Sequence, residues 1–190
     1  MKTIALVAEN GAGKGLFVDL LTKLLPGRRI VSVRFSDALG DILDILGIEK
    51  SRDNIDTLVT ALRRGFDDEG VLVGAMRKRL QRFQAMDADI VVLDGLRKEL
   101  EISVVRERGG ILVYVAADSK VRFERLKGRA EKADELGMTW EQFEEQSRAA
   151  PQIQIRHVGE TMADVKIENN GSVPELRAAV QAFIETYLRD

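Results

Sequence analysis

The sequence predicts an α/β fold in which helices cover both faces of a central, five-stranded parallel sheet. Apolar runs of strand length alternate with stretches of helical periodicity along the chain, a pattern typical of parallel sheets. The first run, residues 3–8, is continuously apolar, as expected of a strand that is buried on both faces. A chain of 190 residues, 45% of them hydrophobic, can bury a core of ordinary size. We therefore expect one domain over residues 1–190.

The predicted elements follow in order along the chain. Strands are expected at residues 3–8, 30–35, 90–93, 111–116 and 165–167, and helices at about residues 16–25, 37–47, 53–65 and 70–86. Asp118 can cap a helix that runs to about residue 129. Thr139 with Gln142, and Ser172 with Glu175, have the spacing of capping boxes. They predict one helix through about residue 149 and another at the end of the chain.

The composition limits the function classes. The chain carries 29 Lys and Arg against 31 Asp and Glu, whereas proteins that grip nucleic acid usually have a basic excess. The absence of cysteine excludes disulfides, thiolate zinc sites and cysteine nucleophiles. The N-terminal apolar run stops at Glu9, too early for a secretory signal, and no later run reaches the length of a membrane span. We expect a cytoplasmic protein whose partners include neither nucleic acid nor a membrane; the sequence identifies no protein partner.

A glycine-rich loop between the first predicted strand and the first predicted helix is the strongest functional signal. Glycines let the backbone turn its N–H groups inward around a phosphate, and the helix N-terminus adds its positive end. Lys14 can reach the β- and γ-phosphates of a nucleotide. Compared with the Walker A pattern G-x-x-x-x-G-K-[ST], the loop has Ala8 for the first glycine and Gly15 for the hydroxyl residue. The predicted ATP-binding residues are Asn10, Gly11, Ala12, Gly13, Lys14, Gly15 and Leu16; the alternative is a glycine turn that happens to contain a lysine.

The loop resembles that of adenylate kinases, in which G-A-G-K-G is followed by threonine. Here the run from Gly11 to Gly15 matches, and Leu16 takes the place of the threonine. The resemblance implies a P-loop NTPase three-layer fold that uses ATP and Mg²⁺. Without the hydroxyl group, phosphate oxygens and water would hold most of the metal's coordination positions.

A second stretch, Asp94-Gly95-Leu96-Arg97, follows the third predicted strand. It resembles the D-G-F-P-R stretch of adenylate kinases, with one residue fewer. The resemblance implies that Asp94 orients the waters of the metal and that Arg97 holds the acceptor phosphate. The alternative for Asp94 is a helix cap.

Three arginines, Arg122, Arg125 and Arg129, are spaced to share one helix face. This row borders an apolar row, so we expect it to be solvated yet held by the core, as suits a clamp on a transferring phosphoryl group. The stretch from Arg125 to Arg129 resembles the R-[LI]-x-G-R of adenylate kinases, which implies phosphate contacts for its two arginines. The alternative is an ordinary arginine surface.

The acceptor-binding segment is expected at about residues 36–86. Ser36 and Asp37 follow the second predicted strand, where adenylate kinases begin this segment. The arginine that these kinases have three residues beyond the aspartate is Gly40 here. Arg63, with its neighbour Arg64, could supply the missing charge; the alternative is a solvated, basic helix end.

Taken whole, the chain resembles small proteins described as dephospho-CoA-kinase-like or adenylate-kinase-like, from Lys2 to about Ser172. The resemblance implies a short helical lid at about residues 130–151 and places Asn170 near the purine. It predicts a transferase, a nucleotide kinase that moves the γ-phosphoryl group of ATP to a nucleoside or deoxynucleoside monophosphate. The predicted catalytic residues are Lys14, Arg97, Arg125 and Arg129. Two alternatives are phosphorylation of a ribose hydroxyl, as in dephospho-CoA kinase, with Asp37 as the carboxylate, and a nucleotide-binding module without turnover.

Overall fold

The predicted five-stranded parallel sheet is present in the computed structural model. The structure describes residues 1–34, 36–66, 70–96, 98–129 and 137–189, and for Arg52 and Arg129 it describes the backbone alone. The sheet has the order β2-β3-β1-β4-β5, and all four neighbouring pairs are parallel. Its strands are β1 (Lys2–Ala8), β2 (Ile30–Arg34), β3 (Ile90–Asp94), β4 (Ile111–Ala116) and β5 (Val165–Glu168).

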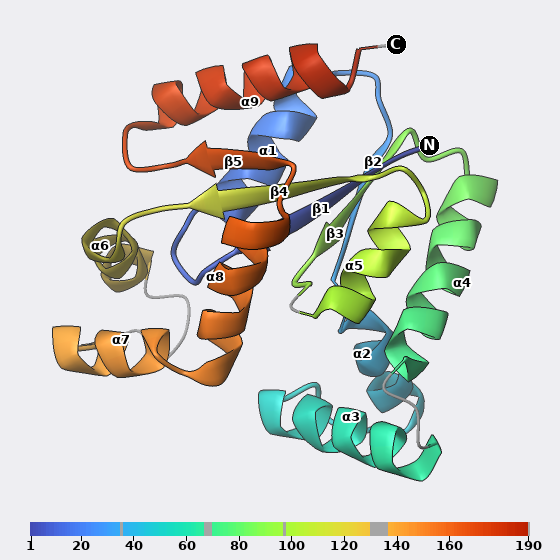
Figure 1. Ribbon diagram of the computed structural model, residues 1–190. Helices are drawn as coiled ribbons and strands as arrows, with labels where there is room; N and C mark the ends of the chain where they lie inside the picture. The colour runs from blue at the N-terminus through green and yellow to red at the C-terminus, as the bar shows by residue number, and fades with distance from the viewer. Residues whose placement is uncertain (35, 67–69, 97, 130–136, 190) are drawn as a thin grey trace.

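Helices connect the strands and cover the sheet (Figure 1). They are α1 (Lys14–Leu24), α2 (Asp37–Ile45), α3 (Arg52–Phe66), α4 (Val71–Ala85), α5 (Glu99–Arg106), α6 (Ser119–Arg129), α7 (Trp140–Ser147), α8 (Ala150–Met162) and α9 (Val173–Tyr187). Both predicted capping boxes are confirmed, at Thr139 before α7 and at Ser172 before α9. Within the described ranges, no helix has both the length and the hydropathy needed to span a membrane.

The three central strands, β1, β3 and β4, bury both of their faces, which explains their continuously apolar sequences. Along β1, Ile4 and Leu6 face a core shared with α1 and α9, whereas Ala5 and Val7 face a core shared with α2, α4, α5 and α8. Alternate residues of a strand point to opposite faces, so one apolar run supplies both cores. The result is three layers, with α1 and α9 on one side of the sheet (Figure 1).

Two helices, α5 and α8, were not predicted from the sequence. The first is short, and its buried residues are Ile102, Val104 and Val105, a weak helical pattern. The second begins with Pro151 in its first turn, a favourable start for a helix. It packs so closely on the sheet that a Cβ on Gly159 would lie 2.4 Å from the ring of Tyr114. Tertiary packing therefore stabilises α8 where local periodicity gives little sign of it.

The strand register brings five chain segments to one edge of the sheet. Asp94, the last residue of β3, lies opposite Leu6 of β1 and Arg34 of β2, and Ala116 lies opposite Glu168. All strands are parallel, so their carboxyl ends share this edge, where α/β proteins commonly bind ligands.

Candidate active site

The glycine loop at the end of β1 is closely surrounded by side chains from other elements. Gly11 and Gly13 have φ angles of +80° and +99°, in the left-handed region that favours glycine. A Cβ on Gly13 would lie 2.2 Å from Nδ2 of Asn169, and one on Gly11 would lie 2.7 Å from the carbonyl oxygen of Arg122. Both backbone conformation and packing therefore require glycine at these two positions.

Helix α1 begins directly at the loop and presents a positive end. Gly13 is its N-cap and contributes no side-chain hydrogen bond, and its first turn contains no acidic residue. The side chain of Lys14, its first residue, forms an ion pair with Oδ1 of Asp94 at the end of β3. Arg34 lies on the other side of this carboxylate, with Nε 4.0 Å from Oδ2. The Asp94 side chain is 14% exposed and that of Lys14 33% exposed, so the lysine can still meet an arriving phosphate.

The start of the predicted acceptor segment lies at the same edge. Asp37 is the first residue of α2, and its Oδ2 accepts a 2.8 Å hydrogen bond from the N–H of Arg34; Ser36 is the N-cap. Gly40 is buried, and the stem of Lys50 lies 3.6 Å from the place of a Cβ there. A lysine from the loop that follows α2 therefore packs beside this glycine.

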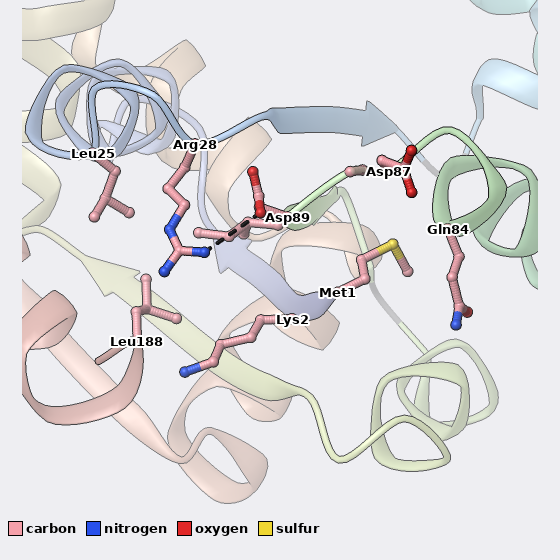
Figure 2. A pocket seen from close by; sticks show the side chains of 10 residues that line it. Met1, Lys2, Leu25, Arg28, Gln84, Asp87, Asp89 and Leu188 are labelled. Carbon is pink, nitrogen blue, oxygen red and sulfur yellow. Dashed lines mark hydrogen bonds and ion pairs between the residues drawn. The ribbon is translucent and has the colours of Figure 1, made fainter. Parts of the chain in front are cut away.

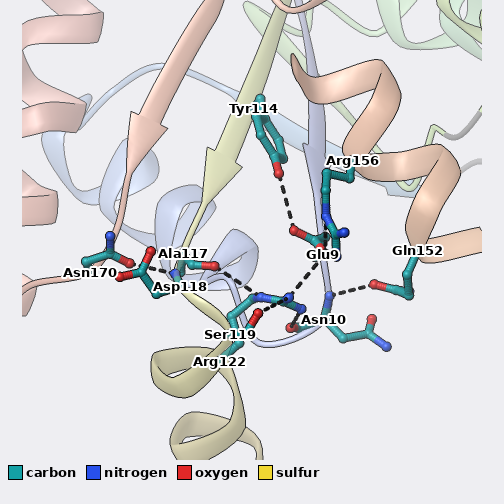
Figure 3. Close-up of polar contacts among 10 residues, drawn as sticks. All are labelled: Glu9, Asn10, Tyr114, Ala117, Asp118, Ser119, Arg122, Gln152, Arg156 and Asn170. Atoms are coloured by element: carbon teal, nitrogen blue, oxygen red, sulfur yellow. Dashed lines mark hydrogen bonds and ion pairs between the residues drawn. The ribbon is translucent and has the colours of Figure 1, made fainter. Parts of the chain in front are cut away.

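Glu9, the second residue of the loop, is the centre of a buried polar network (Figure 3). Its carboxylate is 6% exposed. Oε1 forms an ion pair with Arg122 of α6 at 3.1 Å and accepts a hydrogen bond from Arg156 of α8 at 2.7 Å. Oε2 accepts a hydrogen bond from the hydroxyl of Tyr114 at 3.3 Å. A buried carboxylate is stable only with such partners. Two positive charges face one negative charge, so this network carries a net positive charge beside the loop.

Arg122 is buried, and our prediction that its row of arginines is solvated is wrong at this position. Its side chain is 2% exposed and bonds Glu9, the carbonyl oxygens of Asn10 and Ala117, and the hydroxyl of Ser119. Burial lowers the pKa of Arg122, while the charge of Glu9 acts in the opposite direction. The helix face predicted from spacing is right, but the end of β4 and the glycine loop close over its first arginine.

Glu9 also shifts the pKa values of its other two partners, Arg156 and Tyr114. The hydrogen bond to Glu9 is the main cause that raises the pKa of Arg156. Burial, followed by the charge of Glu9, raises the pKa of Tyr114 to about 12. The phenol therefore keeps its proton at neutral pH and acts as a donor to the carboxylate.

Arg125 lies one helical turn from Arg122 and joins α6 to the segment after β5. Nη1 donates a 2.8 Å hydrogen bond to the carbonyl oxygen of Asn169. The buried amide of Asn169 in turn donates to the carbonyl oxygen of Ala12, at 2.8 Å. Nη1 of Arg125 is also 3.9 Å from the place of a Cβ on Gly13. The guanidinium is thus beside the glycine loop, where a phosphate contact is within reach.

Related sequences show which proteins this chain resembles. A UPF0200 protein of Thermococcus kodakarensis is 31% identical over 179 residues, which cover 92% of this chain and 92% of that protein. A UPF0200 protein of Thermococcus gammatolerans is 30% identical over 186 residues, covering 94% of this chain and 92% of that protein. The chain belongs to the UPF0200 family. No protein-family model matches its sequence.

The fold of this UPF0200 protein is that of P-loop small kinases. A shikimate kinase from Bacteroides thetaiotaomicron superposes with a TM-score of 0.60 at 16% identity, covering 99% of each chain. This likeness confirms the predicted α/β fold and the resemblance to the P-loop kinases. It concerns the fold alone.

Other predicted site residues of the UPF0200 chain belong to elements other than the glycine loop or lie outside the described residues. Arg63 is half-buried on α3, a helix that packs against α2 and α4. Asn170 accepts a 2.7 Å hydrogen bond from the N–H of Asp118, and its neighbour Asn169 contacts the loop instead. Arg97, the side chain of Arg129 and residues 130–136 of the predicted lid lie outside the part that the structure describes.

Glu9, Arg156 and Asn169 are parts of this site that were not predicted from the sequence. One signal was present: a glutamate inside an anion-binding loop must be neutralised if phosphate is to bind there. The identity of the neutralising groups had no local signal, because Arg156 is 147 residues away in sequence.

A pocket of about 400 Å³ lies at the opposite edge of the sheet (Figure 2). Residues at the amino ends of β1 and β3, among them Lys2 and Asp89, line it together with Leu188. Asp89 accepts hydrogen bonds from the N–H of Arg29, at 2.7 Å, and from the guanidinium of Arg28, at 3.4 Å. This pocket is formed at the amino edge of the sheet and is not part of the candidate site.

Proposed function

We propose that this protein is an ATP-dependent phosphotransferase that moves the γ-phosphoryl group of ATP to a nucleoside or deoxynucleoside monophosphate. One observation carries the proposal: Lys14 begins a helix whose free N-terminus follows a loop with two left-handed glycines, and its ammonium meets a carboxylate at the end of β3. A loop of this shape provides inward N–H groups, a helix dipole and a mobile positive charge for a polyphosphate.

Such a site acts mainly by neutralising the negative charge of the phosphates. Phosphoryl transfer needs in-line positioning and stabilisation of charge on the equatorial oxygens rather than a covalent protein intermediate. Lys14 and Arg125 lie next to the loop and are assigned this role, together with Arg97 and Arg129. The predicted lid, residues 130–151, would exclude water from the transferred group.

Asp94 fits a role in holding Mg²⁺ through water. Its carboxylate is at the carboxyl end of the strand beside β1, and Oδ1 is bound to Lys14, an interaction that phosphate can replace. The ion would supply positive charge to the phosphates. When Lys14 turns to a phosphate, the carboxylate of Asp94 is left to accept hydrogen bonds from water.

Transfer of the phosphoryl group to a hydroxyl is the second candidate function, and α2, the first helix of the predicted acceptor-binding segment, favours it. Asp37, Asp41 and Asp44 recur along α2 at intervals of four and three residues, so they share one face. Lys50 forms an ion pair with Asp44 at 2.5 Å. Arg79 forms another with Asp41, at 2.8 Å. These two carboxylates are therefore neutralised by cations. Asp37, at the start of α2, is the carboxylate nearest the end of β2, and a carboxylate there suits a hydroxyl, which can donate a hydrogen bond, better than a second phosphate.

The choice of acceptor can be tested with purified protein, MgATP and a panel of nucleoside monophosphates, deoxynucleoside monophosphates and dephospho-CoA. The readout is acceptor-dependent release of ADP. A monophosphate that stimulates release supports the proposal, whereas stimulation by dephospho-CoA alone supports the hydroxyl acceptor. Tight ATP binding without transfer to any acceptor would support a nucleotide-binding module.

Replacing Leu16 tests whether the missing hydroxyl weakens the site. Leu16 is half-buried and packs against the core formed by α1 and α9. We expect Leu16→Thr to give little change or a modest gain in Mg²⁺ affinity, because phosphate oxygens and water can hold the ion. Mg²⁺ dependence of ADP release at saturating ATP measures this. A large gain in turnover would instead indicate that the natural protein is a weakened kinase.

Replacing Arg125 tests whether this arginine stabilises the transferred phosphoryl group. We expect Arg125→Ala to lower kcat much more than it weakens ATP binding, because charge on the transferred group peaks in the transition state. Arg125→Lys should recover only part of the loss, since an ammonium cannot make a planar two-point contact. Lys127 is exposed on the same helix, so Lys127→Ala is the matched control. Steady-state kinetics gives kcat for each variant, and titration gives its ATP affinity. Equally small changes in kcat for Arg125→Ala and Lys127→Ala would mean that Arg125 has no special role in the transition state.

A further inference from the structure

The glycine loop contacts helices α6 and α8, which precede and follow α7 in the chain. From α6, Arg122 bonds both the carboxylate of Glu9 and the carbonyl oxygen of Asn10. From α8, Arg156 bonds the same carboxylate, and Oε1 of Gln152 accepts a 3.2 Å hydrogen bond from the N–H of Asn10. Two consecutive loop residues are thus held from both sides (Figure 3).

Within this network, the side chain of Glu9 connects α6 and α8. Its Oε1 is shared by Arg122 at 3.1 Å and by Arg156 at 2.7 Å, so one carboxylate oxygen bridges α6 and α8. The backbone carbonyl of the same residue accepts from the N–H of Ala12 at 3.1 Å and so shapes the turn of the loop. A shift of the loop on binding phosphate therefore changes the geometry of both ion pairs.

The same network continues to an aromatic cluster on α6 and α7. The guanidinium of Arg122 lies over the ring of Phe143, 5.3 Å from its centroid. That ring lies 5.4 Å from the ring of Trp140, which also contacts Phe123 at 5.3 Å. Each step from Glu9 to Trp140 is a direct contact, and Trp140 is the sole tryptophan of the chain.

We propose that Glu9 is a positioning residue that couples nucleotide occupancy of the glycine loop to the packing of α7, by holding Arg122 and Arg156 against the loop. The coupling rests on the proposed binding of ATP and concerns the same site. It predicts that ATP changes the surroundings of Trp140, although this side chain belongs to a helix outside the loop. A contiguous set of contacts of this kind is the physical basis of coupling between sites.

Tryptophan fluorescence together with calorimetry tests the coupling without knowledge of the acceptor. The wild-type chain should bind ATP and change its Trp140 emission on saturation. Glu9→Gln keeps the size of the side chain but removes the charge that holds Arg122 and Arg156. At saturating ATP this variant should lose most of the emission change. A general loss of stability would not remove a signal measured on folded, fully occupied protein.

Two further variants keep the test decisive. Arg156→Gln alters a side chain that is 46% exposed, so it should fold even where Glu9→Gln does not, and it should also reduce the emission change. Arg148→Gln is the control, because Arg148 is 76% exposed and pairs with Glu144 at the C-terminal end of α7. ATP binding with an unchanged emission response in the Glu9 and Arg156 variants, or with no response in the wild type, would overturn the coupling alone. A wild-type chain that binds no ATP would overturn both the coupling and the proposed function.

Discussion

Lys14→Ala should lower kcat/KM by a factor on the order of 10²–10³, or about 3–4 kcal/mol of transition-state stabilisation. Lys14 stands at the first turn of α1 and has the carboxylate of Asp94 as its partner. In the reaction its charge lies where the phosphoryl oxygens become most negative. The free energy of unfolding should change little, because the lysine is partly exposed and Arg34 stays beside Asp94.

The measurement is ADP release with the best acceptor of the panel, beside urea unfolding of each variant. Lys23→Ala is the matched control, since Lys23 is an exposed lysine in the last turn of the same helix. Normal turnover of folded Lys14→Ala protein would show that the glycine loop has been wrongly assigned.

Arg122→Met should destabilise the protein by about 3–5 kcal/mol, the usual effect of removing one partner of a buried ion pair. The replacement leaves Glu9 buried with Arg156 and Tyr114 as its remaining partners. It also frees the carbonyl oxygens of Asn10 and Ala117 from their guanidinium donor. For a chain of this size the melting temperature should fall by about 2–4 °C for each kcal/mol.

Urea unfolding of the single and double variants measures this effect. In the double variant Glu9→Gln, Arg122→Met, the neutral amide costs less to bury than the carboxylate, so the two losses should be less than additive. Arg148→Met is the control and should cost at most about 1 kcal/mol, as expected of an exposed pair. A loss at Arg122 no larger than that at Arg148 would contradict the buried network.

The sequence by itself determined the strands, most of the helices and the glycine loop. These features depend on interactions between near neighbours: apolar runs of strand length, helical periodicity, capping boxes at Thr139 and Ser172, and glycines before Lys14. Such signals are readable because each involves residues within a few positions of one another. Helix α8 was missed for the same reason, since it is held mainly by contact with the sheet, at Gly159.

Only the tertiary structure decided how the loop is neutralised and held. Spacing placed Arg122 and Arg125 on one helix face, but it could not show that the first is buried against Glu9 and the second reaches Asn169. Nor could spacing show that Arg156, 147 residues from Glu9 in sequence, reaches the loop. A buried carboxylate takes whichever donors the packing of distant elements brings within hydrogen-bonding distance, and parallel strands bring together segments that are far apart in sequence. The glycines and the lysine of the loop are therefore recognisable from neighbouring residues in the sequence. The charges that surround the loop depend on how the sheet and its helices bring distant segments together.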